Sequence, residues 1–427
     1  MTNEESGIKD KSVEYAGIYI YNIAMNLNET PSANRTHIAF FGRRNAGKSS
    51  LVNAVTGQAA ALVSDKKGTT TDPVYKSMEL LPLGPVVIID TPGFDDEGEL
   101  GEMRVNRTRQ VLNKTDIAVL VLDSEHDVSL IPEKDLINLF ESKKIPYIIV
   151  QNKYDLLNDE RKSPLNNIHP PLLSSLQIPV SAKTGFNIDL LKEKIASLRT
   201  NEPDKYLIRD LIKQNDFIVL VIPIDKAAPK GRLILPQQQM IRDILEAGST
   251  AIAVRESELE QTLVSMGKKP ALVITDSQVF AQVSAVVPQE IPLTSFSILF
   301  ARFKGFLETA VKGAAALDNI NDNDKILICE GCTHHRQCDD IGTVKLPRMI
   351  KNHCKSEPDF CFCSGGDFPA DLSVYKLIIH CGSCMLNERE MQYRKNLACE
   401  QNIPFTNYGI AIAHITGILK RSIAMFN

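Results

Sequence analysis

The sequence predicts an α/β protein with three domains, of which the first binds a nucleotide through a phosphate-binding loop. Short apolar runs suited to buried parallel strands alternate with stretches of helical spacing, and the first run leads directly into a glycine-rich turn. The length of 427 residues also favours several domains, because single cores seldom exceed about 250 to 300 residues. We expect an N-terminal extension and three domains, at residues 1–35, 36–202, 203–298 and 299–427.

In the first domain we expect a doubly wound sheet. The predicted strands are His37–Phe41, Val86–Asp90, Ile117–Leu122, Ile145–Val150 and a strand that ends at Pro179–Ser181. The predicted helices are Lys48–Val55, Glu133–Ser142 and Ile188–Leu198.

A polar break, Asn201–Asp204, precedes a second series of strands and helices. Its predicted strands are Phe217–Ile222, Ala251–Val254 and Ala271–Thr275, and its predicted helices are Pro236–Glu246 and Glu256–Met266. Because this series has no phosphate loop and no cluster of catalytic residue types, we expect an interdomain spacer or a subunit interface. The third segment contains the predicted strands Lys325–Cys329 and Lys376–His380 and a closing helix, Ile410–Ile423.

Composition and charge narrow the class of protein. An apolar content of 43% and a charged content of 23% are typical of soluble globular proteins. The net charge of −4 gives no electrostatic reason to expect nucleic acid or anionic lipid as a partner. No run approaches the roughly 18 apolar residues of a membrane span, so we expect neither nucleic-acid nor membrane binding.

The N-terminal residues have only a slight similarity to a signal peptide. Ala16–Met25 is moderately apolar and follows Lys9 and Lys11, but it has no clean apolar core and no A-x-A-like cleavage site. We therefore expect a cytoplasmic protein with a disordered or docking extension, in which Met25 is a candidate for the true start.

Gly42-Arg-Arg-Asn-Ala-Gly-Lys-Ser49 matches the phosphate-loop pattern G-x-x-x-x-G-K-[ST] between a predicted strand and a predicted helix. The glycines let backbone N–H groups approach the phosphates at the positive end of the helix. Lys48 is expected to reach the β- and γ-phosphates, and the Ser49 hydroxyl to bind Mg²⁺. The loop residues expected to contact the nucleotide are Asn45, Ala46, Gly47, Lys48, Ser49 and Ser50.

Three further motifs follow in the order that a GTP site requires. Asp90-Thr-Pro-Gly93 ends a strand, so that Asp90 can hold Mg²⁺ through water and the Gly93 N–H can contact the γ-phosphate. In Asn152-Lys153-Tyr-Asp155, the Asp155 carboxylate can accept two hydrogen bonds from guanine that adenine cannot donate. Ser181-Ala182-Lys183 places a backbone N–H on guanine O6. The ordered set predicts a domain that binds GTP or GDP and hydrolyses GTP.

Gly68-Thr-Thr-Thr-Asp72 lies where a switch loop is expected, and we assign Thr70 as its Mg²⁺ ligand. The motifs resemble the translation-factor-like GTPases of the tRNA-modification and ribosome-assembly type. In that group an Asn matching Asn45 helps to bind K⁺, with carbonyl groups from the loop at Ser64–Thr69. Phe94 stands where small signalling GTPases carry a water-orienting Gln. The resemblance therefore implies slow, potassium-stimulated hydrolysis, with Lys48, Asn45, Thr70 and Gly93 as the catalytic residues.

The nine cysteines all lie at or after Cys329, which favours a metal or iron–sulfur site over a disulfide framework. Cys332-Thr-His334 follows one predicted strand and His380-Cys-Gly-Ser-Cys384 follows another. If these strands are parallel neighbours, both motifs meet at the carboxyl edge of one sheet.

Such a site contains three thiolates, from Cys332, Cys381 and Cys384, with His334 or His380 near a fourth position. The spacing alone leaves zinc, an iron–sulfur cluster and unliganded cysteines open. For the other cysteines we expect mainly core or surface thiols, and they are Cys329, Cys338, Cys354, Cys361, Cys363 and Cys399.

The combination of motifs resembles the FeFe-hydrogenase maturation GTPase family, over nearly the whole chain from about Thr30. The resemblance is carried by residues 42–50 and 68–79, Ala228-Pro-Lys-Gly-Arg-Leu233, Val273-Ile-Thr-Asp-Ser277, Glu330-Gly-Cys-Thr-His334 and Ile378-Ile-His-Cys-Gly-Ser-Cys384. It implies a P-loop GTPase domain, an α/β dimerisation domain and an α/β iron–sulfur cluster-binding domain.

The same resemblance implies a function and a set of partners. The three motif cysteines would hold a 4Fe–4S cluster with an exchangeable fourth site. A scaffold of this kind receives a di-iron precursor from two radical-SAM maturases and delivers it to the FeFe-hydrogenase apoprotein as a homodimer. The alternative is a potassium-dependent GTPase that acts on RNA or ribosomes and has a structural zinc domain.

Overall fold

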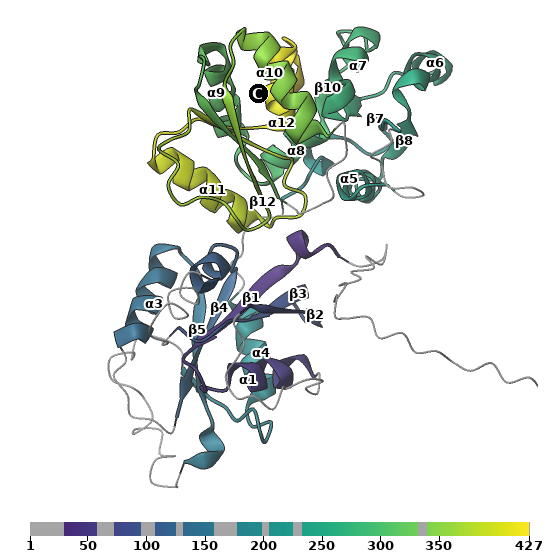
Figure 1. Ribbon diagram of the computed structural model, residues 1–427. Helices are drawn as coiled ribbons and strands as arrows, with labels where there is room; N and C mark the ends of the chain where they lie inside the picture. The colour runs from purple at the N-terminus through teal and green to yellow at the C-terminus, as the bar shows by residue number, and fades with distance from the viewer. Residues whose placement is uncertain are drawn as a thin grey trace, which may run out of the picture. The chain divides into compact units, whose positions relative to one another are not determined.

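The computed structural model describes residues 30–57, 72–94, 107–124, 131–157, 177–198, 205–224, 233–331 and 340–426. These residues form three sheets covered by helices, which confirms the predicted α/β class (Figure 1). None of the helices in these ranges combines the length and hydropathy that a membrane-spanning segment needs.

The first sheet has six strands in the order β2-β3-β1-β4-β5-β6. They are β1 (Thr36–Gly42), β2 (Val74–Leu80), β3 (Gly84–Asp90), β4 (Ile117–Asp123), β5 (Tyr147–Asn152) and β6 (Gln177–Pro179). The strands predicted for this domain are confirmed. β2 was not predicted, and because it pairs antiparallel with β3, the sheet is not wholly parallel.

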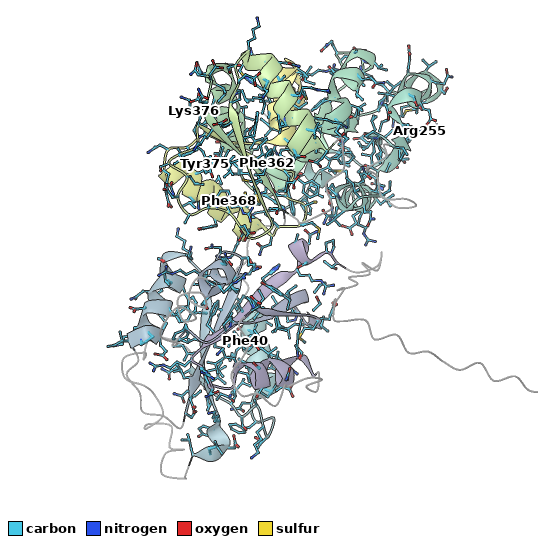
Figure 2. The ribbon with its side chains drawn as sticks, in the orientation of Figure 1. Phe40, Arg255, Phe362, Phe368, Tyr375 and Lys376 are labelled. Atoms are coloured by element: carbon cyan, nitrogen blue, oxygen red, sulfur yellow. The ribbon has the colours of Figure 1, made fainter. Side chains whose placement is uncertain are left out.

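Helices cover both faces of this sheet, as the alternation of side chains along β1 requires. Ile38 and Phe40 pack against α1 (Lys48–Thr56) and α4 (Ile188–Ser197). Ala39 and Phe41 point to the other face, which α3 (Ile131–Ser142) covers. Phe40 is fully buried in the middle of the sheet (Figure 2).

The second sheet is wholly parallel, with the strand order β10-β9-β7-β8. Its strands are β7 (Phe217–Val221), β8 (Thr250–Val254), β9 (Leu272–Thr275) and β10 (Leu293–Ser295). Its helices are α5 (Leu235–Glu246), α6 (Leu259–Ser265), α7 (Phe280–Val286) and α8 (Phe296–Phe303). The predicted boundary between residues 298 and 299 falls inside α8.

The third sheet is also parallel, with the strand order β12-β11-β13-β14. Its strands are β11 (Lys325–Glu330), β12 (Asp359–Ser364), β13 (Leu377–His380) and β14 (Phe405–Asn407). Its helices are α9 (Leu307–Ala314), α10 (Leu346–Cys354), α11 (Glu388–Glu400), α12 (Tyr408–Ile415) and α13 (Leu419–Ile423). A Cβ atom on Gly313 of α9 would lie 2.2 Å from the Phe405 carbonyl oxygen. This helix therefore packs so closely against β14 that no side chain fits at position 313.

The single closing helix predicted over Ile410–Ile423 is wrong. The structure has two helices there, α12 and α13, because the chain turns at Gly417 with a φ of 76°. A positive φ of this kind favours glycine and commonly ends a helix.

The second and third sheets share one hydrophobic core. A single cluster of buried side chains contains residues of both, including Val219, Val273, Leu327, Ile378 and Phe405. The two sheets are therefore packed together without a polar layer between these residues.

Candidate functional site

The phosphate loop connects β1 to α1 and depends on glycine at Gly47. This residue has a φ of 83°, and a Cβ atom added there would lie 2.3 Å from Nδ2 of Asn152. α1 begins at Lys48, so the unpaired N–H groups of its first turn face the loop. A helix N-terminus behind a glycine-rich turn is an arrangement that binds phosphate groups.

The Lys48 side chain lies within the loop and is 7% exposed. Its Nζ donates to the carbonyl oxygens of Gly42 at 2.9 Å and Arg43 at 2.7 Å. Asn45 and Ser50 are exposed, and Asn45 has a φ of 63°. The loop thus holds its ammonium group close to where phosphate oxygens would lie.

Ser49 and Asp90 form a pair suited to Mg²⁺. The Ser49 hydroxyl donates to Oδ2 of Asp90 at 2.5 Å, whereas the buried Oδ1 has no hydrogen-bond partner among the described residues. Burial raises the pKa of Asp90, although the hydrogen bond from Ser49 and the charge of Lys48 oppose the shift. A divalent cation would satisfy the orphaned oxygen and compensate the buried charge.

Asn152 connects the guanine motifs to the phosphate loop. Its Nδ2 donates to the Ala46 carbonyl oxygen at 3.0 Å, and its Oδ1 accepts from the Ala182 N–H at 3.1 Å. In the same region Oδ1 of Asp155 accepts from the Ser181 hydroxyl at 2.6 Å. The structure therefore brings three of the predicted motifs together.

The remaining predicted nucleotide residues occupy the same edge of the sheet or fall outside the described residues. Nζ of Lys153 lies 2.6 Å from Asp123, and Lys183 follows Ala182 in the turn after β6. Gly93 follows the end of β3, and Phe94 packs against the core on the α3 side. Thr70 and the loop at Ser64–Thr69 lie outside the described residues.

The two strands that precede the cysteine motifs are parallel neighbours, which is the condition under which the two motifs meet at one edge of the sheet. β11 pairs with β13, and Cys329 stands opposite His380. Cys332 and His334 lie outside the described residues, which end at Gly331 before the motif. The Gly331 N–H nevertheless donates to Sγ of Cys381 at 3.1 Å, so the start of the first motif contacts the second.

Backbone N–H groups of the protein donate hydrogen bonds to sulfur in the loop that carries Cys381 and Cys384. Sγ of Cys381 also accepts from the Ser383 N–H at 3.4 Å. Burial raises the pKa of the Cys381 thiol, and these two N–H groups oppose the shift by stabilising the thiolate. Backbone N–H groups directed at sulfur are typical of iron–sulfur sites, so the chemistry of the loop fits such a cluster.

A buried lysine that the sequence analysis missed supports this loop. Nζ of Lys304 donates to the carbonyl oxygens of Ser383 and Leu386. Burial lowers the pKa of Lys304 to about 8, with the nearby Cys384 and Cys381 opposing the shift. No local motif marks Lys304, because it reaches the loop from the segment after α8.

His380 is fully buried at the end of β13, and both of its ring nitrogens have partners. Nη1 of Arg394 donates to Nε2 at 3.0 Å, and Nδ1 lies 3.1 Å from both the Ser383 hydroxyl and the Cys381 carbonyl oxygen. Burial and the Arg394 charge hold the pKa of His380 well below its usual value. A role as cluster ligand would require the ring to give up one of these bonds.

Arg394 itself is covered by the ring of Phe368, whose centroid lies 5.1 Å from the guanidinium carbon. Its Nε also donates to Glu390 at 2.9 Å. This buried arginine belongs to α11 and was not predicted from the sequence.

Two other cysteines meet on adjacent strands. Cys363 of β12 stands opposite Cys329 of β11. Burial raises the pKa of Cys329, which stays protonated, and a hydrogen bond from its thiol lowers the pKa of Cys363. Cys354, Cys361 and Cys399 are free thiols, and Cys338 lies outside the described residues.

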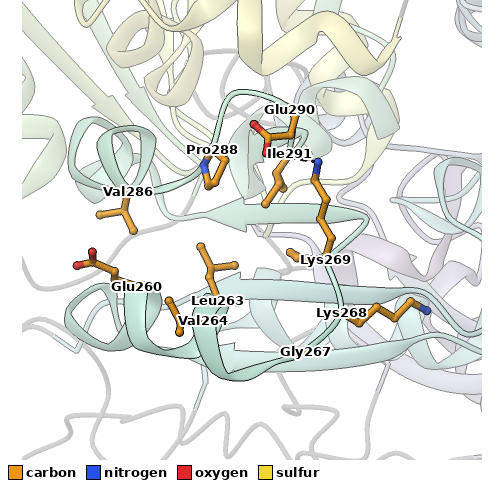
Figure 3. Close-up of a pocket in the computed structure, with 11 residues that line it drawn as sticks. Glu260, Leu263, Val264, Gly267, Lys268, Lys269, Val286, Pro288, Glu290 and Ile291 are labelled. Atoms are coloured by element: carbon orange, nitrogen blue, oxygen red, sulfur yellow. Dashed lines mark ion pairs between the residues drawn. The ribbon is translucent and has the colours of Figure 1, made fainter.

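A surface pocket of about 530 Å³ lies beside α6 in the second domain (Figure 3). Its lining includes Leu263, Val264 and Ile291, with an ion pair of 3.6 Å between Lys269 and Glu290. The lining contains none of the predicted site residues, so the pocket is separate from the nucleotide and cysteine motifs.

Three known protein families match successive parts of the chain. The family described as "50S ribosome-binding GTPase" matches residues 37–153. The "Hydrogen maturase F dimerization domain" matches residues 207–305, and the "Hydrogen maturase F tetramerization domain" matches residues 308–425. The last two together span just over half of the chain.

Individual relatives are similar mainly over the GTPase domain. GTPase Der of Wolinella succinogenes is 36% identical over 186 residues, which is 41% of this chain and 38% of that protein. GTPase Era of Clostridium acetobutylicum is 32% identical over 197 residues, or 44% and 64% of the two chains. A crystal structure of Era from Aquifex aeolicus bound to GDP and AlF4⁻ aligns with a TM-score of 0.35 at 21% identity, over 51% and 92% of the chains. The chain thus spans less than two thirds of the length of these curated relatives.

Proposed function

Because the chain belongs to the hydrogen maturase F family, we propose that it is a GTP-hydrolysing scaffold that carries and delivers the di-iron precursor of FeFe-hydrogenase. The observation that carries this proposal is that one chain combines a phosphate loop and two guanine motifs at one sheet edge with a half-buried loop that holds Cys381 and Cys384. The receiving partner is the hydrogenase apoprotein, and the precursor comes from two radical-SAM maturases. We place these events in the cytoplasm.

In the nucleotide site, Lys48 contacts the β- and γ-phosphates, and Asp155 selects guanine. Ser49 and Asp90 hold Mg²⁺, which neutralises charge on the phosphates, and Thr70 completes its shell when GTP is bound. Asn45 binds K⁺ next to the same phosphates. Hydrolysis is slow because Phe94 cannot orient the attacking water.

In the third domain, the thiolates of Cys332, Cys381 and Cys384 hold a 4Fe–4S cluster, which supplies an iron atom with an exchangeable position for the cargo. The N–H groups of Gly331 and Ser383 stabilise the Cys381 thiolate. Since both nitrogens of His380 are engaged in the protein, we assign the fourth position to cargo or to His334.

GTP acts as a switch and not as a source of energy for the cluster chemistry. Ordering of switch loops by the γ-phosphate is the usual mechanism in such domains. In this protein it would change contacts with partner proteins. The names of the two matched C-terminal families support self-association as a dimer and higher oligomer.

The first test is anaerobic purification followed by iron, sulfide and zinc analysis and an EPR spectrum after reduction. About four irons and four sulfides per chain, with a reduced-cluster signal, would support the scaffold. The Lys48→Ala variant should keep its iron but lose hydrogenase maturation in a purified system. Equal GTPase rates in Na⁺ and K⁺ buffers would contradict the role of Asn45.

The rival function is a GTPase that acts on RNA or ribosomes. The name of the GTPase-domain family supports it, but only for the first domain. The same purification separates the two: zinc without sulfide, in a colourless protein, would favour the rival and overturn the scaffold.

A further inference from the structure

Three side chains that neither the nucleotide site nor the cysteine loop uses meet in the third domain. Nε2 of His353 lies 2.8 Å from Oδ1 of Asp318, and Nε2 of His414 lies 2.9 Å and 3.0 Å from its two oxygens. The candidate ligand atoms of all three residues lie within 4.8 Å of one another. The two imidazole rings meet edge to face, with centroids 5.9 Å apart. Both histidines therefore present the same nitrogen to one carboxylate.

Packing fixes these residues on three separate elements. Asp318 belongs to the short helix Ala315–Asn319, His353 to α10 and His414 to α12. Each element is anchored in the same hydrophobic cluster by fully or almost fully buried residues, which are Leu317, Ile350 and Ile412. The three ligand atoms are thus preorganised by a rigid core and do not depend on a surface loop.

Asp318, His353 and His414 lie at the opposite edge of the third sheet from the cysteine loop. In parallel α/β units the helices run antiparallel to the strands, so α10 and α12 end at the edge where the strands begin. His353 and His414 occupy the last turns of these helices. Cys381 and Cys384 instead follow the end of β13, so the two sites are separate.

The donor set selects a particular class of ion. Imidazole favours zinc, iron, nickel and copper over magnesium and calcium, which prefer oxygen ligands. The C-terminal ends of two helices add negative partial charge that favours a cation. Ligand atoms around a tetrahedral Zn²⁺ ion lie about 3.4 Å apart, so the N···O distances of 2.8 and 2.9 Å need to increase by roughly half an ångström when the ion binds.

We propose that Asp318, His353 and His414 bind one divalent transition-metal ion of the zinc or ferrous class, with water in the remaining positions. The side chains of Asp318, His353 and His414 are 51%, 25% and 21% exposed, so an ion and water can reach them. The ion joins α10 and α12 to the helix Ala315–Asn319 and thereby stabilises the third domain.

Cobalt is a suitable probe because it replaces zinc and ferrous ions and reports its ligands by its colour. The cluster-loaded full-length protein is dialysed anaerobically against Co²⁺, and bound cobalt is counted per chain. The wild type should retain about one Co²⁺ at this site, and Asp318→Asn, His353→Ala and His414→Ala should each weaken binding at least about tenfold, since even outer-shell partners of metal ligands contribute that much. Asp359→Asn, which changes an exposed carboxylate at the start of β12, should bind Co²⁺ as the wild type does.

Two further measurements distinguish a specific loss of metal binding from unfolding of a variant. The iron and sulfide content of each variant should match that of the wild type, and His414→Gln should behave as His414→Ala does while filling more of its volume. In cluster-free protein, where the freed motif cysteines can also bind cobalt, the difference spectrum between the wild type and His414→Ala should show weak visible bands without a thiolate-to-cobalt band in the near ultraviolet. Cobalt binding that is absent, or that survives all three substitutions, or that shows only the thiolate band, would overturn the proposal.

Discussion

The side-chain amide of Asn152 donates to the backbone carbonyl oxygen of Ala46 at 3.0 Å. A residue of the guanine motif therefore braces the loop that binds the phosphates, and through Ala182 it also holds the second guanine motif. Asn152 therefore links the part of the site that binds the base to the part that binds the phosphates.

Asn152→Ala should weaken GTP binding about 30-fold. The change removes two hydrogen bonds, each with a net contribution of about 1 kcal/mol, and 1.4 kcal/mol corresponds to a factor of about ten. A titration with a fluorescent guanine nucleotide measures the loss. Lys192→Ala, which removes only an ion pair with Asp189 within α4, should bind as the wild type does. Equal affinities for wild type and Asn152→Ala would show that the bridge does not hold the loop.

Asp90→Asn should reduce the rate of GTP hydrolysis without lowering the stability of the nucleotide-free protein. Burial raises the pKa of Asp90, which means that the folded protein disfavours this carboxylate charge when no cation is present. The variant should therefore melt no lower than the wild type without nucleotide, and Mg²⁺-dependent hydrolysis should fall by about 100-fold or more. Calorimetry and a phosphate-release assay check both parts. A variant that melts lower yet hydrolyses GTP normally would contradict the assignment.

Lys304→Met should weaken the binding of the iron–sulfur cluster and leave GTP binding unchanged. Methionine retains most of the volume but leaves the carbonyl oxygens of Ser383 and Leu386 without their buried donor, at a cost of about 1 to 3 kcal/mol each. Iron should be lost faster when a chelator is added, and this rate is read from the visible absorbance. Lys312→Ala, an exposed lysine on α9, serves as the control. Loss of GTP affinity in the Lys304 variant would indicate general misfolding instead.

His380 should make the third domain sensitive to acid. Its pKa is well below 6.5 in the folded protein, so below pH 6.5 the unfolded chain takes up a proton that the folded chain does not. The stability is complete above about pH 6.5 and should decrease by up to about 1.4 kcal/mol for each unit below it. Opening free energies from hydrogen exchange of the β13 amides measure the slope. His380→Gln should reduce that slope, and an unchanged slope would assign the effect to another group.

Much of the fold could be predicted because the buried strands are short, strongly apolar runs. Ile117–Leu122 and Phe217–Ile222 differ from β4 and β7 only at their ends. β2 could not be predicted, since most of its side chains are half-buried or exposed and it forms the edge of its sheet. The break at Gly417 was missed because apolar residues continue on both sides of it, at Ile415 and Ile418, as they would in one helix.

The nucleotide motifs could be predicted because their spacing along the chain is tied to the sheet that carries them. The position of Cys381 and Cys384 just after β13 could be predicted in the same way, and their role as ligands stays a prediction. Lys304 and Arg394 were missed, since each reaches its partner across the fold and no local pattern marks it. Asp318, His353 and His414 were missed for the same reason, because 35 residues separate the first two and 96 separate Asp318 from His414.

Because the second and third sheets share one continuous core, neither of these two domains is expected to fold when it is separated from the other. A cut between α8 and α9 would expose apolar side chains on both new fragments, such as Ile298 and Phe306. The two parts should therefore melt in a single calorimetric transition and resist proteolysis at their junction. A gene rearrangement that moved only one of them would produce an insoluble fragment, so we expect recombination to transfer both as one block.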